Sequence, residues 1–450
     1  MSHELDEHPW SRASLPTDMT TRKHLSTQNA EDGKRHNLLR RSFAVLGPGL
    51  ITGAADDDPS GISTYSVAGA AYGYATLWIA LLTFPLMAAI QLMCARLGMV
   101  TGRGLAAAVR IYYPRWVLWG SCSILVVANV INIGADLGGM AEATQLITGI
   151  RSLIWIPVYA FFLIGLLFWS SYKLIARMFK WMTVVLFAYV FASFYAHVDW
   201  RHALAVTFVP HLEWSRGFLS VLVAILGTTI SPYLFFWQAA EEVEEGRTKG
   251  RTLAERKGAT AGELRSARAD TIVGMFFSNF IMYFIILTTA ATLHAHGQTD
   301  ITTARQAAEA LRPLAGNGAY LLFTLGLIGT GMLGVPVLVG SCAYAVAEGA
   351  VWRGSMADKP ASARKFYAVM AVAMALGLAL NYLGFNAVKM LFWSAVINGL
   401  LAPPLILLVI LLTSNHKVMG KRVNSPLLRY LGWATFAVMT AAAAGMLITS

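Results

Sequence analysis

The sequence predicts an all-α membrane protein, and three observations support this prediction. Of the 450 residues, 56% are hydrophobic and only 13% are charged, about half the charged fraction of soluble domains. The apolar residues lie in long uninterrupted stretches, not in the alternating pattern of an outer-membrane barrel. Two of these stretches contain a proline beside acidic or small hydroxylated residues. A soluble enzyme is excluded, because so apolar a chain could not bury its side chains in water.

Apolar runs of about twenty residues predict eleven membrane spans. We expect them near 44–71, 75–95, 117–149, 153–170, 174–196, 218–240, 271–292, 320–348, 366–384, 388–412 and 428–448. With the N-terminus in the cytoplasm, 29 of the 35 Lys and Arg residues fall in the tail and the internal loops. Because cationic loops are retained inside, this asymmetry predicts the orientation. The basic residues are dispersed among short loops, so we expect no nucleic-acid partner.

The first span contains three acidic residues, Asp56, Asp57 and Asp58, followed by Pro59 and, two residues later, Gly61. Each Asp at membrane depth costs on the order of 3 kcal/mol on the insertion scale, so three in a row indicate a polar cavity, a partner cation or protonation. Proline removes an amide donor and glycine loosens the backbone, which frees carbonyl oxygens beside the acid. Carboxylate and free carbonyl oxygens together predict a cation site.

The sixth span has a matching interruption, Gly227-Thr228-Thr229-Ile230-Ser231-Pro232-Tyr233. The two breaks occupy the first helix of each five-helix set. Paired discontinuous helices at equivalent places indicate an inverted-repeat transporter with its site at the bilayer midplane. A pair of proline kinks that serve only packing is the alternative.

Short motifs are spread along the chain. The first set is Asp58-Pro59-Ser60-Gly61, Ala68-Gly69-Ala70, Gly73-Tyr74, Leu77-Trp78 and Ala95-Arg96-Leu97-Gly98-Met99-Val100-Thr101-Gly102. Shorter motifs are Asp136-Leu137, Ser278-Asn279, Leu411-Leu412-Thr413-Ser414 and Val418-Met419-Gly420. Together these motifs resemble those of the NRAMP family of divalent-metal transporters over most of residues 45–422. The resemblance implies a LeuT-type fold of two inverted five-helix repeats plus an eleventh helix.

The chain departs from the family pattern at the first break. The family signature there is Asp-Pro-Gly-Asn, so Asp58 and Pro59 match, whereas Ser60 and Gly61 do not. The resemblance therefore implies that an amide ligand is lost at Gly61.

Further departures occur in the sixth and third spans. The sixth-span signature is Ala-x-x-Met-Pro-His, in which Thr228, Ser231 and Tyr233 replace the alanine, methionine and histidine. After Asp136-Leu137 the chain has two glycines where the family often has a glutamate used in proton movement. The pattern is most similar to the NRAMP-related magnesium and manganese transporters.

These residues predict a carrier of a divalent cation that works by alternating access at the two breaks, either as a secondary transporter or as a uniporter. We expect metal ligands from Asp58, Gly61, Thr228 and Ser231. Residues that could line the pathway are Asp56, Asp57, Asp136, Tyr233, Asn279 and Asn398. Because all these ligands are oxygens, the site favours hard ions such as Mg²⁺ or Mn²⁺.

Two other functions stay open. An amino-acid or organic-cation symporter could use the same fold, although three aspartates would repel a substrate carboxylate. A metal sensor could use the long internal loop as its output. No catalytic motif is present, so we expect no enzyme activity and no cofactor, only the transported ion as substrate.

The expected organisation has three parts. Residues 1–42 are polar and of mixed charge, which predicts a disordered cytoplasmic tail. Residues 43–422 would form the ten-helix transport core, and 423–450 the eleventh helix. Residues 241–270 predict a helix at the cytoplasmic face, and the four glutamates with which they begin are expected to form a solvated helix end. We expect an integral protein of the bacterial inner membrane, with the bilayer and the ion as partners; the oligomeric state is open, with a monomer allowed.

Overall fold

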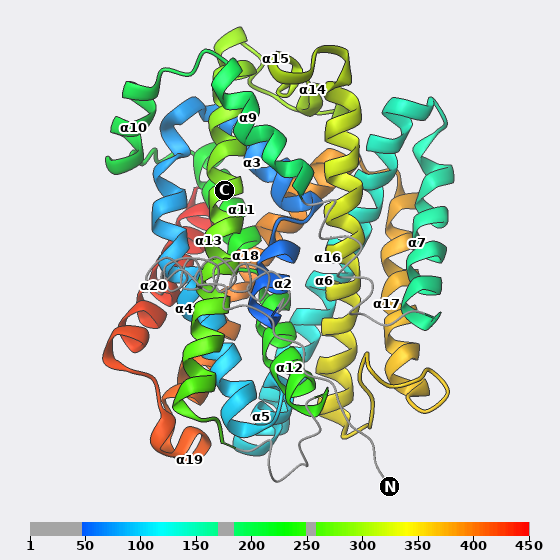
Figure 1. Ribbon diagram of the computed structural model, residues 1–450, viewed down its shortest axis with the longest axis vertical. Helices are drawn as coiled ribbons and strands as arrows, with labels where there is room; N and C mark the ends of the chain where they lie inside the picture. The colour runs from blue at the N-terminus through cyan, green and yellow to red at the C-terminus, as the bar shows by residue number, and fades with distance from the viewer. Residues whose placement is uncertain (1–46, 170–183, 249–257, 450) are drawn as a thin grey trace, which may run out of the picture. The chain divides into compact units, whose positions relative to one another are not determined.

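The computed structural model describes residues 47–169, 184–248 and 258–449, and these residues are helical apart from short connections. The first elements are α2 (Pro48–Asp56), α3 (Pro59–Tyr72), α4 (Trp78–Thr101), α5 (Leu105–Tyr112), α6 (Arg115–Thr148), α7 (Ser152–Trp169) and α9 (Phe187–Tyr195). Next come α10 (Trp200–Phe208), α11 (Arg216–Thr229), α12 (Pro232–Thr248), α13 (Ala261–Thr292), α14 (Ala304–Glu309) and α15 (Arg312–Ala315). The last are α16 (Ala319–Ala350), α17 (Arg364–Leu380), α18 (Ala387–Ser414), α19 (His416–Met419) and α20 (Pro426–Ile448) (Figure 1).

Nine stretches of the described part of the chain are long and apolar enough to cross a bilayer. They correspond to nine of the eleven predicted spans. The predicted span 44–71 is divided into the short helices α2 and α3, and residues 44–46 lie outside the described residues. Of the span 174–196, only the part from residue 184 is described, as a 3-10 turn (Val184–Leu186) followed by α9. The predicted tail 1–42 also lies outside the described residues.

The loop 241–270 contains helix on both sides of residues 249–257. Its described ends continue the neighbouring helices, because α12 runs to Thr248 and α13 begins at Ala261. Thr260 caps α13 through a reciprocal pair of hydrogen bonds with Glu263, which satisfies two free amides at the helix start. Residues 249–257 lie outside the described residues. The four glutamates therefore belong to the end of α12, which agrees with their expected place at a helix end.

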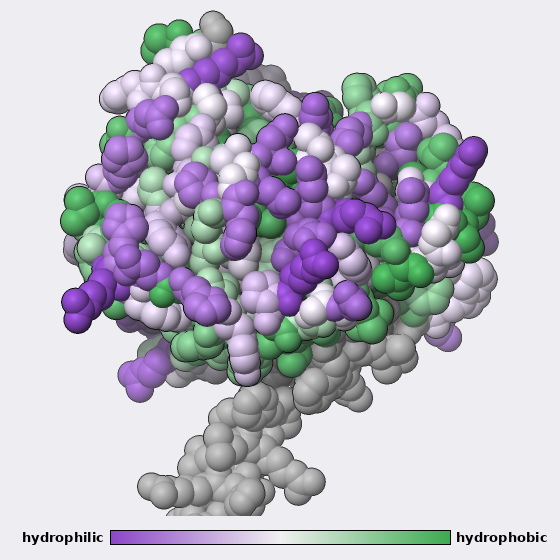
Figure 2. All heavy atoms as spheres, turned by 90° about the horizontal axis from the view of Figure 1, so that it is seen from above, coloured by the Kyte–Doolittle hydropathy of each residue, from purple (hydrophilic) through white to green (hydrophobic). Residues whose placement is uncertain are grey.

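The distribution of polar side chains fits a protein that crosses a bilayer. Figure 2 looks onto the end where α14 and α15 lie and shows hydrophilic side chains across this face, with apolar side chains towards the rim. Large apolar side chains are exposed on the helix flanks, for example Phe161 of α7, which is 69% exposed. Lipid accepts such apolar surface at no cost, whereas water does not.

The break in the first span follows from its sequence. α2 ends at Asp56, and Asp58 adopts an extended backbone with φ −67° and ψ 172°. Pro59 then occupies the first turn of α3, where its missing amide donor costs nothing. The Asp58 side chain accepts a hydrogen bond from the Gly61 amide and so caps α3.

The second break lies between α11 and α12. α11 ends at Thr229, and Pro232 is the first residue of α12. The Ser231 hydroxyl lies 3.0 Å from the Gly227 carbonyl oxygen and 2.7 Å from that of Thr228. The hydroxyl thus replaces backbone donors that the break removes.

Close backbone contacts hold both broken helices in place. A Cβ atom on Gly53 of α2 would lie 2.3 Å from the Gly274 carbonyl oxygen of α13. A Cβ atom on Gly227 of α11 would lie 2.3 Å from the Gly399 amide nitrogen of α18. Only glycine allows these approaches.

Candidate metal centre

Asp58 lies at the first break, is 1% exposed and receives hydrogen bonds from three parts of the chain. Its Oδ1 accepts from the Ser60 hydroxyl at 2.6 Å and from the Gly61 amide at 2.9 Å. Its Oδ2 accepts from the Asn132 side-chain amide of α6 at 3.1 Å and lies 3.3 Å from the Tyr233 hydroxyl of α12. Asp58 therefore joins the first break to α6 and to the second break.

Tyr233 connects the two breaks directly. Its hydroxyl lies 3.0 Å from the carbonyl oxygen of Ala55, in the last turn of α2, as well as 3.3 Å from Asp58. A phenol carries a single hydrogen, so this donor is shared between the two acceptors. Tyr233, one of the predicted pathway residues, therefore lies beside Asp58.

Further along α12, a second set of polar contacts joins this helix to α2. The Thr52 hydroxyl of α2 lies 2.6 Å from the Gln238 side-chain oxygen, and the Gln238 amide donates to Glu242 at 3.0 Å. Gln238 and Glu242 are both buried. The sequence analysis did not identify these residues, although their spacing of four on an apolar helix is a signal that could have done so.

Asp136 of α6 lies one turn from Asn132 and is fully buried. Within the described residues, neither of its carboxylate oxygens has a hydrogen-bond partner of normal geometry. The position that a Gly334 Cβ would occupy lies 3.0 Å from Asp58 Cβ and 3.9 Å from Asp136 Oδ2. Asp58 and Asp136 therefore border the same small space against α16.

Asp56 and Asp57 face a different neighbour. The Ser278 hydroxyl of α13 lies 2.6 Å from Asp56 Oδ2 and 3.2 Å from Asp57 Oδ1. Both side chains are buried, as is Asp58. Because the helix is interrupted after Asp56, the three carboxylates are not arranged with regular helical spacing.

The ligands predicted from the second break lie partly at this site. A Cβ on Gly61 would lie 3.3 Å from Thr228 Oγ1, so these residues are adjacent. Thr228 Oγ1 is buried and has no hydrogen-bond partner among the described residues. Ser231, in contrast, directs its hydroxyl at carbonyl oxygens of its own segment. The Thr228 carbonyl is one of those acceptors, so its oxygen already has a donor.

Two predicted pathway residues are not connected to Asp58 by hydrogen bonds. Asn279 of α13 accepts from the Thr83 hydroxyl at 2.8 Å and contacts the sulfur of Met87, both on α4. Asn398 of α18 is buried, and within the described part of the chain its amide nitrogen has no partner. Asn279 thus belongs to an interface between α13 and α4. The sequence of α13 alone cannot distinguish such a position from one that lines a pathway.

Asn132 is the residue at this site that the sequence analysis missed. A signal was present, since Asn129, Asn132 and Asp136 follow at spacings of three and four in an otherwise apolar helix and so share one face. No group of three or more His, Cys, Asp or Glu side chains that could hold a metal ion occurs in the described ranges. Any ion at Asp58 would therefore need neutral oxygen ligands as well.

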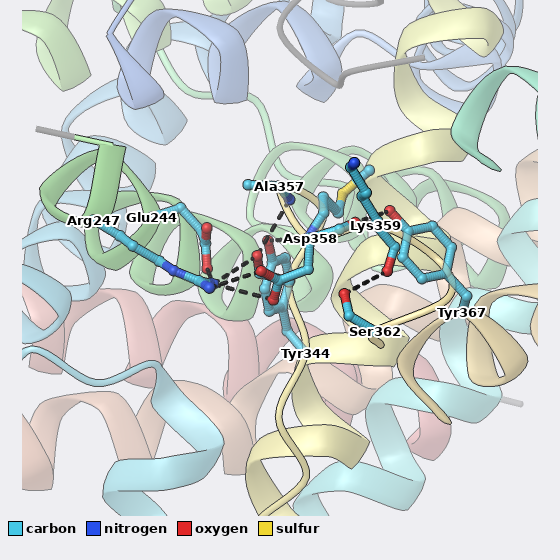
Figure 3. Close-up of polar contacts among 10 residues, drawn as sticks. Glu244, Arg247, Tyr344, Ala357, Asp358, Lys359, Ser362 and Tyr367 are labelled. Carbon is cyan, nitrogen blue, oxygen red and sulfur yellow. Dashed lines mark hydrogen bonds and ion pairs between the residues drawn. The ribbon is translucent and has the colours of Figure 1, made fainter. Parts of the chain in front are cut away.

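A second polar cluster lies at the C-terminal end of α12 (Figure 3). The Arg247 guanidinium binds both Asp358 oxygens, at 2.7 and 3.2 Å, and also donates to the Ser355 hydroxyl at 3.0 Å. Glu244 lies 3.8 Å from Arg247 on the same helix. The Tyr367 hydroxyl of α17 donates to the Asp358 carbonyl at 2.9 Å. The cluster thus joins one half of a broken helix to the segment between α16 and α17.

The fold and the site define a helical membrane protein of the LeuT type, in which two broken helices meet at a buried carboxylate. The chain belongs to the NRAMP family, because the family model described as natural resistance-associated macrophage protein-like matches residues 49–449. One relative is the divalent metal cation transporter MntH of Caldanaerobacter subterraneus, 26% identical over 91% of this chain and 94% of its own length.

Two solved structures share the fold. A manganese transporter of Eremococcus coleocola superposes with a TM-score of 0.70 at 19% identity, covering 88% of this chain and 84% of its own. Mhp1, a transporter of the nucleobase-cation-symport-1 family, superposes with a TM-score of 0.57 at 15% identity, covering 90% of this chain and 93% of its own. The predicted LeuT-type fold and the resemblance to the NRAMP family are confirmed.

Proposed function

We propose that the protein carries a divalent metal cation across the membrane by alternating access, with Mg²⁺ or Mn²⁺ as the favoured ion. The observation that carries this proposal is the buried Asp58 where the two helix breaks meet. In the described part of the chain, no Lys or Arg forms an ion pair with it. A buried carboxylate without a counter-charge is costly, and a cation removes that cost. The MntH relative is named a divalent metal cation transporter, which supports the proposed class of substrate.

The ion is held by oxygens, with Asp58 as the charged ligand. The backbone near Gly61 and Thr228 and the Ser231 hydroxyl complete this set. The Ser231 hydroxyl oxygen and the Thr228 carbonyl oxygen each keep a lone pair for the ion beside the hydrogen bond between them. Carboxylate, carbonyl and hydroxyl oxygens favour hard cations, and Mg²⁺ keeps several of its waters when only one or two carboxylates bind it. The path out of the site follows Thr52, Gln238 and Glu242 along the contact between α2 and α12.

Flux into liposomes tests this proposal. Purified protein should admit Mn²⁺ and Mg²⁺ above the rate of protein-free liposomes, with Cd²⁺ a weaker competitor. A panel of amino acids and organic cations in the same liposomes tests the symporter alternative, which the shared fold with Mhp1 keeps open. Uptake of an organic substrate without metal uptake would overturn the proposal.

The remaining assignments belong to the same proposal. The N-terminus lies in the cytoplasm of a bacterium, residues 43–422 form the transport core in the inner membrane, and 423–450 form an added helix. The carrier needs no cofactor and performs no enzymatic reaction; a monomer is sufficient, because both breaks come from one chain.

A further inference from the structure

One face of α6 carries a row of buried polar side chains, Asn129, Asn132 and Asp136. The Asn129 amide donates to the Leu338 carbonyl of α16 at 3.0 Å, so it serves the contact between these two helices. Asn132 instead directs its amide at Asp58 Oδ2. Asp136 lies on the same face, one turn further along α6 and beside Gly334 of α16.

Three oxygens of Asn132 and Asp136 have no hydrogen-bond donor among the described residues. They are Asn132 Oδ1 and both carboxylate oxygens of Asp136, and both residues are 0% exposed. The Ser60 backbone amide lies near Asp136 but outside hydrogen-bond geometry, and the Asp58 carboxylate repels that of Asp136. Buried polar atoms are normally paired, since an unpaired one costs on the order of 1–3 kcal/mol. These oxygens are therefore available to a ligand that accepts their lone pairs.

The charges point to a cation. Asp58 and Asp136 both lie beside the Gly334 Cβ position, and no ion pair with Lys or Arg serves either of them in the described ranges. A divalent ion carries the two positive charges that match two carboxylates. Mg²⁺ and Mn²⁺ prefer carboxylate and amide oxygens of this kind.

We propose that Asn132 and Asp136 of α6 bind the transported divalent cation together with Asp58, so that the ion is held between two carboxylates and the Asn132 side-chain oxygen. This inference rests on the proposed function and adds a second charged ligand to it. Asn132 keeps its amide on Asp58, and its oxygen takes the place of the amide ligand that the chain lacks at Gly61. Gly334 leaves the space in which both carboxylates can approach the ion.

The test is equilibrium binding of Mn²⁺ to the purified full-length protein, by loss of the free Mn²⁺ electron paramagnetic resonance signal. We expect Asp136→Asn to raise the Kd at least tenfold and Asn132→Ala severalfold. Asn129→Ala is the matched control, because it removes a buried amide from the same face of α6 without touching Asp58. Its Kd should stay within twofold of wild type. Size-exclusion elution and the Tm without metal establish that each variant is folded.

A second readout is the rise in Tm on adding Mn²⁺, which binding to the folded state produces. It should be large in wild type and in Asn129→Ala and much smaller in Asp136→Asn. Gly334→Ala, which places a methyl group against Asp58, should also raise the Kd. A wild-type Kd in a folded Asp136→Asn protein would overturn this inference and leave the proposed function intact. Absence of Mn²⁺ and Mg²⁺ binding in wild type would instead overturn the proposed function.

Discussion

Asp58 serves both as the proposed ligand and as the cap of α3, so its substitutions must separate the two roles. Asn can still cap a helix, whereas Ala loses about 1 kcal/mol at such a position. We expect Asp58→Asn to remain folded and to lose at least nine-tenths of Mn²⁺ uptake, because the negative charge is gone. Uptake into liposomes, with Tm as the folding control, measures this. Unchanged uptake in Asp58→Asn would refute the site.

The Asp56 and Asp57 side chains share one donor, Ser278, which is not among the hydrogen-bond donors to Asp58 in the described part of the chain. Asp57→Asn should therefore reduce uptake less than Asp58→Asn does. The two variants form a matched pair, since each removes one charge from the same interrupted span.

Ser231 determines whether the second break offers an oxygen or a sulfur. A thioether favours soft ions and binds Mg²⁺ poorly, so Ser231→Met should increase the affinity for Cd²⁺ relative to Mn²⁺. Ser231 is buried, and the larger side chain will cost about 1–3 kcal/mol of stability. Ser231→Leu is the control of similar size without sulfur, and an equal Cd²⁺ gain in both variants would contradict the explanation.

At the scale of elements, the Arg247–Asp358 pair links α12 to the segment between α16 and α17 (Figure 3). Pairs this exposed contribute up to about 1 kcal/mol, equivalent to a shift of about fivefold between two conformations. Arg247→Ala should therefore favour the state in which α12 has moved away from this segment. Ala240 of α12 is buried, so it becomes accessible only when this helix moves. The reactivity of Ala240→Cys towards a charged maleimide, in a chain without its native cysteines, should therefore rise by up to about fivefold.

The control exchanges the two charges. Arg247→Asp and Asp358→Arg should each raise the reactivity, and the double variant should bring it back towards wild type. Equal reactivity in all four proteins would show that the ion pair does not influence the conformation.

At the scale of the whole molecule, we expect transport without obligatory proton coupling. A coupled carrier needs a group that changes protonation as the ion comes and goes, and His is the usual one. This chain has Tyr233, of a type that ordinarily titrates near pH 10, and Gly139 where the NRAMP family has its His and Glu. Internal pH in voltage-clamped liposomes should stay constant during Mn²⁺ entry. Acidification of the wild-type liposomes that requires Mn²⁺ entry would show the prediction wrong.

Orientation is a second property of the whole molecule. Lys389 and Lys417 are exposed near opposite ends of α18, and the distribution of basic residues places the first outside and the second inside. Lys389→Cys should react with an impermeant maleimide on intact cells, whereas Lys417→Cys should react only after permeabilisation. The reverse pattern would invert the proposed topology.

Local chemistry determined much of the fold from the sequence alone. Long apolar runs specify membrane helices because the bilayer allows few alternatives. In the described part of the chain, nine of the predicted spans are present as helices long enough to cross the bilayer. The breaks at Asp58-Pro59 and Ser231-Pro232 were predictable because proline cannot continue a hydrogen-bonded helix. The continuation of α12 past Glu241 was not, since a charged helix end and a separate surface helix have the same local pattern.

Contacts between distant segments decided the site. The sequence identifies three adjacent aspartates, but only the packing of α13 assigns Asp56 and Asp57 to Ser278 and leaves Asp58 to Asn132 and Tyr233. The bond from Asn132 to Asp58 joins residues 74 positions apart, and no local pattern specifies such a pair. Which partner a buried polar side chain meets depends on the helix that packs against its face. That packing exists only in the assembled structure, so the sequence of one helix does not show it.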